Sequence, residues 1–135
     1  MANTIRLEIA TPEATVYSAD VEMVTLPGIE GQMGILPQHV HLITQLVPGE
    51  MIVRRGGHDE FLAVGEGLVE VTGDRVAIVT NMAIAAEAID EAVAEEARKR
   101  AAARLRERLS SEEVASVNAA LARSLAQLRV KRRHH

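Results

Sequence analysis

Side chains of the kinds used in catalysis are few in this chain, and their spacing does not form a known catalytic pattern. There is no cysteine, and the internal histidines are His39, His41 and His58. A nucleophile–histidine–carboxylate triad therefore has few candidates, and no nucleophile-elbow motif lies near these histidines. His39-x-His41 would point two imidazoles the same way in an extended segment, but a zinc site needs at least a third protein ligand. We expect neither a catalytic site nor a metal site.

Two glycine-rich stretches share part of the pattern of a phosphate-binding loop. Gly65-Glu66-Gly67 has the opening of a dinucleotide fingerprint, but residue 70 is glutamate and no helical pattern follows. The stretch at 26–39 lacks the Gly-Lys-Ser/Thr of a P-loop. It predicts a structural loop with a type II turn at Pro27-Gly28, in which glycine serves turn geometry or lets a partner approach closely. The loop residues are Pro27, Gly28, Gly31 and Gly34.

Basic residues gather in the segment 98–108. They are Arg98, Lys99, Arg100, Arg104, Arg106 and Arg108. Such a run suits nucleic acid or an acidic partner, whereas interleaved acids and alanines favour a solvated helix face. With one Tyr, one Phe and no Trp, the chain has little to stack on single-stranded bases or to line a ligand pocket. We expect no nucleic-acid partner.

The chain changes composition near residue 86, which predicts two domains, 1–86 and 87–135. The first part holds 11 acids and 4 bases, and the second holds 8 acids and 11 bases. The last proline is Pro48 and the last glycine is Gly73. No run of 18 apolar residues occurs, so we expect a protein that is soluble or that meets a membrane only through partners.

Short strands account for the first part. Residues 5–9 alternate apolar and polar side chains, and residues 21–26 form a more continuously apolar strand. Gly56-Gly57 is the two-residue signal of a hairpin between strands at 50–55 and 58–64. Thr72-Gly73-Asp74 separates a second pair, at 68–71 and 75–80. With no helical pattern between them, these strands predict an antiparallel sandwich or barrel.

Two antiparallel helices account for the second part. Asp90 is a predicted N-cap, and Ser110 with Glu113 has the form of a capping box for a second helix. The expected apolar stripe of the first helix is Ile89, Val93, Ala97, Ala101, Leu105 and Leu109, and that of the second is Val114, Val117, Leu121, Leu125 and Leu128. Two ion pairs at i,i+4 spacing are expected on the first helix, Glu95–Lys99 and Glu96–Arg100.

The motifs together resemble the epsilon subunit of bacterial F-type ATP synthase. The resemblance rests on Leu-Pro-Gly-Ile-Glu-Gly-Gln-Met-Gly-Ile-Leu-Pro-Gln-His at 26–39, Gly-Glu-Gly-Leu-Val-Glu-Val at 65–71 and Leu-Ala-Arg-Ser-Leu-Ala-Gln-Leu-Arg-Val at 121–130. It runs over essentially the whole chain. It implies an antiparallel β-sandwich of about ten strands followed by a two-helix hairpin, and a subunit that is not itself an enzyme.

The resemblance also implies partners and roles. It implies a rotor subunit of the central stalk in a proton-translocating enzyme, peripheral to the cytoplasmic face of the bacterial plasma membrane and bound to the gamma subunit and the ring of c subunits. Gln32, Met33 and His39 would face the polar loops of the c ring. The basic residues at 98–108 would meet acidic segments of the beta subunit and block ATP hydrolysis. The isolated protein is expected to be a monomer.

Some members of this family bind ATP on the folded hairpin through an Ile-Asp-x-x-Arg-Ala motif. In this chain Val93 stands at the position of the motif's arginine. Ile84 stands at the position of an upstream glutamate, and Gln127 at that of a further basic partner. The matching residues that remain are Asp90, Arg100 and Arg123. Because charge-assisted bonds to the nucleotide are lost, we expect weak or no ATP binding and no other cofactor.

Other classes of protein predict different features. A small soluble β-sandwich that binds a ligand, or an enzyme, would have a deep polar pocket with perturbed titratable groups. A coiled-coil adaptor would associate with itself through residues 88–128, although the apolar stripe there is short.

Overall fold

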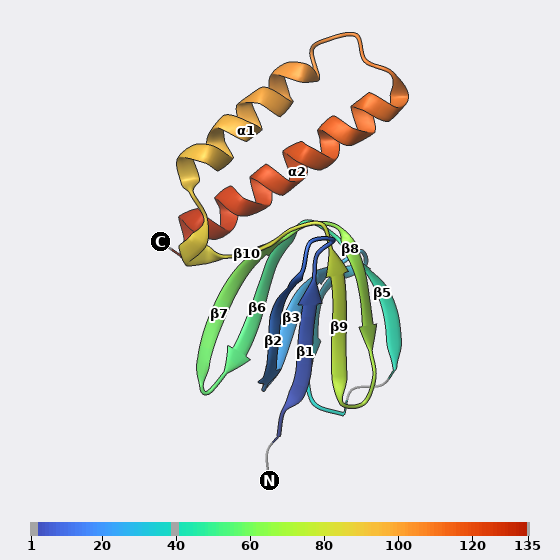
Figure 1. The fold of residues 1–135 in the computed structure, drawn as a ribbon, viewed down its shortest axis with the longest axis vertical. Coiled ribbons are helices and arrows are strands. Elements are labelled where there is room, and N and C mark those ends of the chain that lie inside the picture. The colour runs from blue at the N-terminus through green and yellow to red at the C-terminus, as the bar shows by residue number, and fades with distance from the viewer. Residues whose placement is uncertain (1–2, 39–40, 135) are drawn as a thin grey trace.

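The structure, a computed structural model, describes residues 3–38 and 41–134. Strands occupy the first part and helices the second, as predicted (Figure 1). The strands are β1 (Ile5–Ala10), β2 (Thr15–Val21), β3 (Met23–Gly28), β4 (Gly31–Ile35), β5 (Leu42–Leu46), β6 (Gly49–Arg55), β7 (His58–Val64), β8 (Gly67–Val71), β9 (Arg75–Thr80) and β10 (Ala83–Ala85). A short 3₁₀ helix, η1 (Ala86–Ala88), leads to α1 (Glu91–Arg104) and α2 (Ser111–Arg133).

All ten strands belong to one sheet that folds over on itself into a sandwich. The strand order is β10-β7-β6-β3-β5-β8-β9-β1-β2, and β4 pairs with β3. Every pair is antiparallel except β1 with β9, which run parallel. The predicted sandwich of about ten strands followed by a two-helix hairpin is therefore confirmed.

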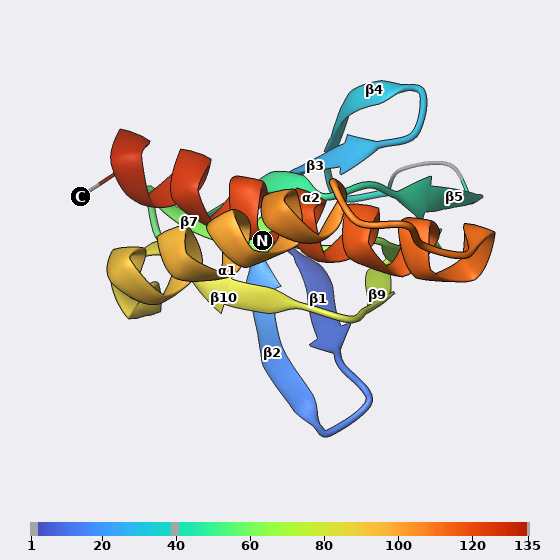
Figure 2. The ribbon, with the colours of Figure 1, turned by 90° about the horizontal axis from the view of Figure 1, so that it is seen from above.

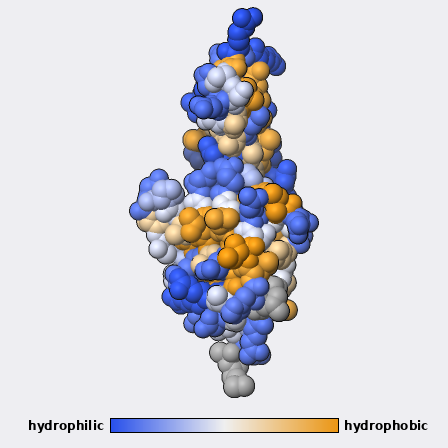
Figure 3. All heavy atoms as spheres, turned by 90° about the vertical axis from the view of Figure 1, so that its right-hand side faces the viewer, coloured by the Kyte–Doolittle hydropathy of each residue, from blue (hydrophilic) through white to orange (hydrophobic). Residues whose placement is uncertain are grey.

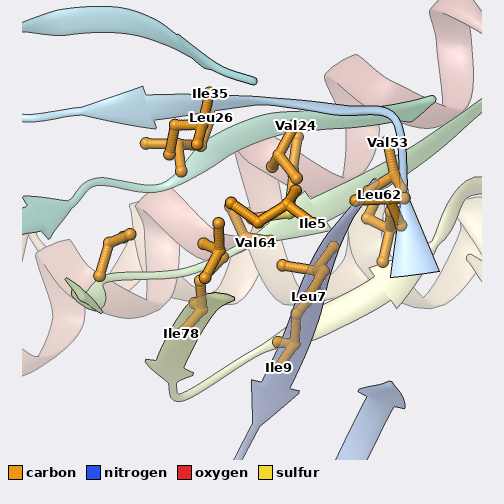
Figure 4. Close-up of a cluster of buried hydrophobic side chains, with 14 of the residues drawn as sticks. Ile5, Leu7, Ile9, Val24, Leu26, Ile35, Val53, Leu62, Val64 and Ile78 are labelled. Atoms are coloured by element: carbon orange, nitrogen blue, oxygen red, sulfur yellow. The ribbon is translucent and has the colours of Figure 1, made fainter. Parts of the chain in front are cut away.

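The core lies between the two layers and is made of branched aliphatic side chains. They point inward from alternate positions of β1, β3, β6, β7 and β9, among others (Figure 4). Ile5, Leu7 and Ile9 on β1 are almost fully buried, as the alternation predicted. Burial of one such side chain is worth about 1.5–3 kcal/mol relative to leaving it in water.

The seam between β2 and the β6–β7 hairpin is closed by side chains. The Tyr17 hydroxyl donates to Glu60 Oε1 at 2.8 Å, and the Arg55 guanidinium lies 5.7 Å from the centre of the Tyr17 ring. Burial, with the neighbouring Glu60 carboxylate, raises the pKa of Tyr17 to about 12. This contact ties strands that the sheet hydrogen bonds do not join directly.

The two predicted turns behave differently. Gly56 and Gly57 have φ of +62° and +78° and connect β6 to β7 in two residues, as expected for a type I′ hairpin. The type II turn predicted at Pro27-Gly28 is wrong. Both residues are the end of β3, and the chain reverses at Ile29 and Glu30 instead. Of the glycines in this hairpin, Gly31 takes the positive φ, +121°.

The helices begin where predicted, but their apolar stripes are narrower than expected. Asp90 accepts from the Val93 N–H, and Ser110 and Glu113 form the predicted capping box. The first helix ends at Arg104, so Leu105 and Leu109 fall in the connection. Val93 and Leu105 on the first stripe are exposed, and so are Val114 and Leu125 on the second. The first stripe is a strict four-residue repeat, which drifts around a helix of 3.6 residues per turn and so leaves the contact face.

The ion pairs on α1 also differ from the prediction. Glu95 pairs with Arg98 at 2.5 Å and with Arg132 of α2 at 3.0 Å, and not with Lys99. The hydrogen bond from Arg98 is the main reason that the pKa of Glu95 is lowered. In the described residues Glu96 has no ion pair with Arg100 within 4.0 Å. Arg132 of α2 thus forms ion pairs with Glu91 and Glu95 of α1, while Glu95 is also paired within α1 with Arg98.

The hairpin lies folded across one end of the sandwich (Figure 1). α2 packs against β6, β7 and η1, and α1 packs on α2. Seen from above, the helices cross the sandwich while the β1–β2 and β3–β4 hairpins project on opposite sides (Figure 2). The contact between hairpin and sandwich is a second, smaller cluster of Ala63, Met82, Ala86, Ile89, Ala126 and Val130.

Candidate functional site

An apolar patch on the outside of the sandwich is the clearest candidate for a binding surface. Leu68 on β8 lies opposite Val79 on β9, and Ile43 on β5 lies two residues from Gln45, the partner of Leu68. Ile43, Leu68 and Val79 are 70%, 56% and 61% exposed. Figure 3 shows apolar surface gathered on this side of the sandwich, below the helices. We call Ile43, Leu68 and Val79 the apolar face. A contiguous apolar patch of this kind marks a docking site in a protein that works with partners.

The sequence of β9 carries a signal for the apolar face. β9 reads Arg-Val-Ala-Ile-Val-Thr, which is apolar on both faces at its centre. In a sheet with one wet side, the outward positions should be polar. Val76 and Ile78 fill the core, so Ala77 and Val79 must point outward. A strand that is apolar at consecutive positions therefore indicates that both faces of the sheet are covered there, one by the core and the other by a partner.

The stretch predicted as a structural loop is instead mostly strand, because its residues 26–28 and 31–35 pair as the β3–β4 hairpin, with Pro27 and Gly28 on β3 and Gly31 and Gly34 on β4. Gln32 is exposed, whereas Met33 is half-buried and packs against the core. Ile29 at the tip of the hairpin is exposed, and no pattern in the sequence marks it as a surface residue. His39 lies outside the described residues. Of the two described residues that were predicted to face the c ring, Gln32 is thus exposed and Met33 is half-buried.

The six predicted basic residues do not form a single helix face. Arg98 is half-buried beside Glu95, whereas Lys99 and Arg100 are exposed on α1. Arg104 closes α1 and lies 3.7 Å from Glu107 and 3.6 Å from Glu113. Arg106 and Arg108 are exposed in the connection between the helices. Four of the six, Lys99, Arg100, Arg106 and Arg108, are therefore open to solvent and have no ion pair among the described residues, whereas Arg98 and Arg104 are paired with glutamates.

The Gly65-Glu66-Gly67 motif brings the sandwich and α2 together. A Cβ on Gly65 would lie 2.0 Å from Asn81 Oδ1, and one on Gly67 would lie 2.0 Å from the Val79 carbonyl oxygen. The glycines therefore permit a tight passage beneath the chain at 79–81. Glu66 between them receives hydrogen bonds from Asn81 Nδ2 and from Arg123, the latter at 3.2 Å. The motif positions a carboxylate for the hairpin and not a phosphate.

The three residues that match the family's ATP motif do not share a common site, because each lies in a different part of the structure. Asp90 accepts from the Val93 N–H at 3.2 Å, Arg123 donates to Glu66, and Arg100 is exposed on α1. Gln127 donates to the Met82 sulfur at 3.0 Å. Val93, at the position of the motif's arginine, is 61% exposed.

The described residues offer little for catalysis. They contain no group of three or more His, Asp or Glu side chains placed to hold a metal ion. A hollow of about 400 Å³ beside the segment 36–38 has a single ionisable side chain in its lining, Asp74. In the same part of the chain, neither helix is long and apolar enough to cross a membrane.

Family models match the chain in two consecutive pieces. The β-sandwich domain of the ATP synthase delta/epsilon chain matches residues 4–86, and the long α-helix domain of the same chain matches residues 87–132.

Whole-chain relatives agree with the models. The chain is 42% identical over 126 residues to the ATP synthase epsilon chain of Herpetosiphon aurantiacus, covering 93% of both chains. It is 41% identical over 134 residues to that of Dehalococcoides mccartyi strain BAV1, covering 97% of this chain and 96% of the relative. With the epsilon chain of Moorella thermoacetica it shares 42% identity over 127 residues, covering 93% and 95%.

Solved structures share the fold. A chain of the Euglena gracilis mitochondrial ATP synthase assembly of OSCP, F1 and c-ring matches with a TM-score of 0.77 and 24% identity, covering 96% of this chain and 81% of that one. A chain of the central stalk and c-ring of the Tetrahymena thermophila mitochondrial ATP synthase matches with a TM-score of 0.55 and 16% identity. The match covers 96% of this chain and 94% of that one. The resemblance seen in the sequence is confirmed: this chain belongs to the ATP synthase delta/epsilon chain family, as a non-catalytic epsilon subunit.

Proposed function

We propose that this chain is a rotor subunit of a proton-translocating F-type ATP synthase and that its sandwich docks onto the gamma subunit through the apolar face. The observation that carries the proposal is the exposure of Ile43, Leu68 and Val79 on three adjoining strands. Large side chains in such positions are stabilised when a partner removes them from water, by about 25 cal/mol per Å² of apolar surface. On this proposal the subunit is peripheral to the cytoplasmic face of the bacterial plasma membrane.

Two substitutions matched in chemistry and exposure test the docking surface. Val79 on the apolar face and Val93 on α1 are each 61% exposed. Val79→Glu would bury an unpaired carboxylate in the interface, so we expect it to weaken binding to the purified gamma subunit by at least about tenfold. Val93→Glu should leave binding within about twofold. Equal losses for both variants, measured by biolayer interferometry, would contradict this assignment of the docking surface.

The second part of the proposal concerns the c ring. The β3–β4 hairpin projects from the sandwich (Figure 2). Gln32, on β4, is exposed to solvent. We assign Gln32, Met33 and His39 to the side that meets the polar loops of the c ring, with Met33 acting mainly by supporting the hairpin from the core. Gln32→Lys should lower coupled ATP synthesis in membrane vesicles, and Thr15→Lys on the opposite β1–β2 hairpin should not. The reverse pattern would remove the β3–β4 hairpin from the c-ring surface.

We assign the regulatory role to the helical hairpin, α1 and α2. Arg100, Arg106 and Arg108 are exposed toward its outer end, where they can meet acidic segments of the beta subunit once the hairpin extends. Arg98 is paired with Glu95 in the folded state, so we expect it to contribute after the helices separate. Inhibition of ATP hydrolysis should fall when Arg106 and Arg108 are both replaced by glutamine, and should persist when Arg6, on the sandwich, is replaced.

We propose that ATP binds weakly or not at all to the folded hairpin. Arg123 is paired with Glu66 and Gln127 with Met82, so the polar groups nearest to the motif contact the sandwich. The motif's arginine is replaced by an exposed valine. Isothermal titration of the isolated chain with Mg-ATP should show no saturable heat in the micromolar range. A low-micromolar site would overturn this part of the proposal.

A further inference from the structure

The last turn of α2 makes a concentrated set of polar contacts outside its own helix. Four consecutive residues, Lys131, Arg132, Arg133 and His134, reach three different parts of the fold. Lys131 Nζ donates to the Ala86 carbonyl of η1 at 3.2 Å, and Arg132 contacts Glu91 at 2.8 Å and Glu95 at 3.0 Å on α1. Arg133 and His134 reach Glu50 on β6, at 3.2 Å and 2.6 Å.

Glu50 is an unusual residue for its place in the sandwich. Its side chain is 8% exposed, and its partner across the β6–β7 pair is the fully buried Ala63. A buried carboxylate is costly unless it is paired and hydrogen-bonded. Both of its oxygens are used, Oε1 by Arg133 and Oε2 by His134 Nε2. The sandwich thus provides a carboxylate whose partners, as far as the described residues show, come from the hairpin.

His134 is held by a second contact. Its ring stacks on Phe61 of β7, with ring centres 3.6 Å apart and planes 10° from parallel. Phe61 is the only phenylalanine in the chain. The stacking fixes the plane of the imidazole, and because a carboxylate only accepts, Glu50 Oε2 accepts a hydrogen bond from the His134 Nε2–H. The direction of the His134 side chain is therefore determined by the sandwich.

The remaining contacts between the helical hairpin and the sandwich are less directional, because most of them are apolar packing. Ala126 and Val130 pack on Ala63 and Met82. Arg123 forms a salt bridge with Glu66, a carboxylate that is 44% exposed, whereas Arg133 and His134 meet Glu50, which is only 8% exposed. Small apolar contacts hold surfaces together without fixing one position. The polar contacts at the end of α2 supply directional interactions that the alanine-rich surface lacks.

We propose that Arg133 and His134 form an ionic clasp on Glu50 that, with the contact of Lys131 to the Ala86 carbonyl beside it, holds the hairpin in its folded position on the sandwich. Breaking the clasp releases the base of α2 and lets the hairpin leave as a unit, because Arg132 still joins α2 to α1. Opening also rehydrates Glu50, so the carboxylate does not oppose release. The biological meaning of the clasp rests on the proposed regulatory hairpin, but its existence can be tested on the isolated chain.

Electron–electron distance measurements on the full-length protein test the clasp directly. The chain has no cysteine, so nitroxide labels can be placed uniquely at Ser111→Cys and His58→Cys, both exposed and on opposite sides of the hairpin–sandwich contact. A second pair, Glu96→Cys and Asn118→Cys, reports the distance between the two helices. The variant is Glu50→Gln, which keeps the shape of the side chain and removes its charge.

The matched control is Glu8→Gln, which removes a sandwich carboxylate paired with Arg75 at 3.1 Å on neighbouring strands. We expect Glu50→Gln to raise the population with a longer sandwich–hairpin distance by about tenfold or more, with the helix–helix distance unchanged. Glu8→Gln should change neither distance. In the unaltered chain, moving from about 0.05 to 0.5 M NaCl should shift the population in the same direction as Glu50→Gln, since Arg133 is exposed enough to be screened.

Two results would overturn the clasp. One is a sandwich–hairpin distance that responds no more to Glu50→Gln than to Glu8→Gln. The other is a helix–helix distance that broadens together with it, because the substitution would then unfold the hairpin and not release it. Should Glu50→Gln fail to fold, the double variant Arg133→Gln, His134→Gln removes the clasp from the other side, and it must give the same release. None of these results depends on another subunit, so they leave docking to gamma and inhibition to their own tests.

Discussion

The sandwich and the hairpin bury apolar side chains of different sizes. Inside the sandwich the fully buried residues are mostly isoleucine, leucine and valine from both layers. Between the helices and beneath them, about half of the buried positions are alanine, and the larger apolar ones are Met82, Ile89, Val117, Leu128 and Val130. Since apolar stabilisation follows buried area, the sandwich should be stable alone, whereas the hairpin depends on its caps, ion pairs and contact with the sandwich.

The same difference explains why one part suits docking and the other suits movement. A sheet held by hydrogen bonds along its whole length presents the apolar face in a fixed geometry. Helices that pack through alanine can separate with little apolar area newly exposed to water. Rigidity in the sandwich and weak attachment of the hairpin are thus consequences of side-chain size.

The largest expected effect compares one core residue in each part. Ile78→Ala removes a side chain that is 1% exposed in the sandwich core, and should lower the free energy of unfolding of the whole sandwich by about 2–5 kcal/mol. Leu128→Ala, at 2% exposure on α2, should reduce hydrogen-exchange protection in the helices alone. If Leu128→Ala lowered protection throughout the sandwich, the two parts would be one cooperative unit and the comparison would fail.

A smaller loss is expected when the tight passage under β9 is overfilled. Gly67→Ala places a Cβ 2.0 Å from the Val79 carbonyl oxygen, a backbone atom that cannot move aside easily. We expect a cost of about 1–3 kcal/mol in urea unfolding of the sandwich. Gly73→Ala is the control, because nothing lies within 4 Å of its added Cβ. A neutral Gly67→Ala would show that the β8–β9 pair is looser than the structure indicates.

The capping box gives the corresponding test in the hairpin. Ser110→Ala removes the acceptor for the Glu113 N–H at 3.2 Å and should destabilise the start of α2 by about 1 kcal/mol. Ser111→Ala, one residue later, should be neutral. Hydrogen exchange of the first turn of α2 reads the effect, while thermal unfolding of the sandwich should not move. A shift in sandwich unfolding would mean that the two parts share more energy than their contacts indicate.

The smallest effect concerns Tyr17 at the seam of the sandwich. Its pKa is raised from 10.0 to about 12, so folding favours the protonated phenol. The stabilisation is complete below pH 10 and is lost as pH rises toward 12; solvent screening should keep the loss below about 1 kcal/mol. Because Tyr17 is the only tyrosine and there is no tryptophan, phenolate absorbance reports its titration alone. An ordinary titration midpoint near pH 10 would show that the seam is open.

Much of this fold follows from local sequence signals. Gly56-Gly57, Asp90 and the Ser110–Glu113 box act through neighbours in the chain, and each is found where predicted. The turn predicted at Pro27-Gly28 is wrong because strand pairing with β4 overrides the turn preference of that dipeptide.

The surface features were harder to predict from the sequence. The Glu50 anchor depends on Arg133 and His134, more than 80 residues away, and no short-range pattern reveals such a meeting. The apolar face depends on which side of each strand meets the core. Residue identities alone gave the family and its expected partners; the pairing of side chains required the three-dimensional arrangement.

The separation of docking from regulation is tested most directly by truncation after Glu87 in a reconstituted complex of gamma with the catalytic alpha and beta subunits. The measurement is ATP hydrolysis and binding affinity for the full-length chain and for residues 1–87, after thermal unfolding confirms that the truncated sandwich folds. We expect an affinity within about twofold and loss of inhibition, because the apolar face lies wholly within the sandwich. A truncated chain that no longer binds gamma, or that still inhibits, would contradict the division of labour proposed for the two parts.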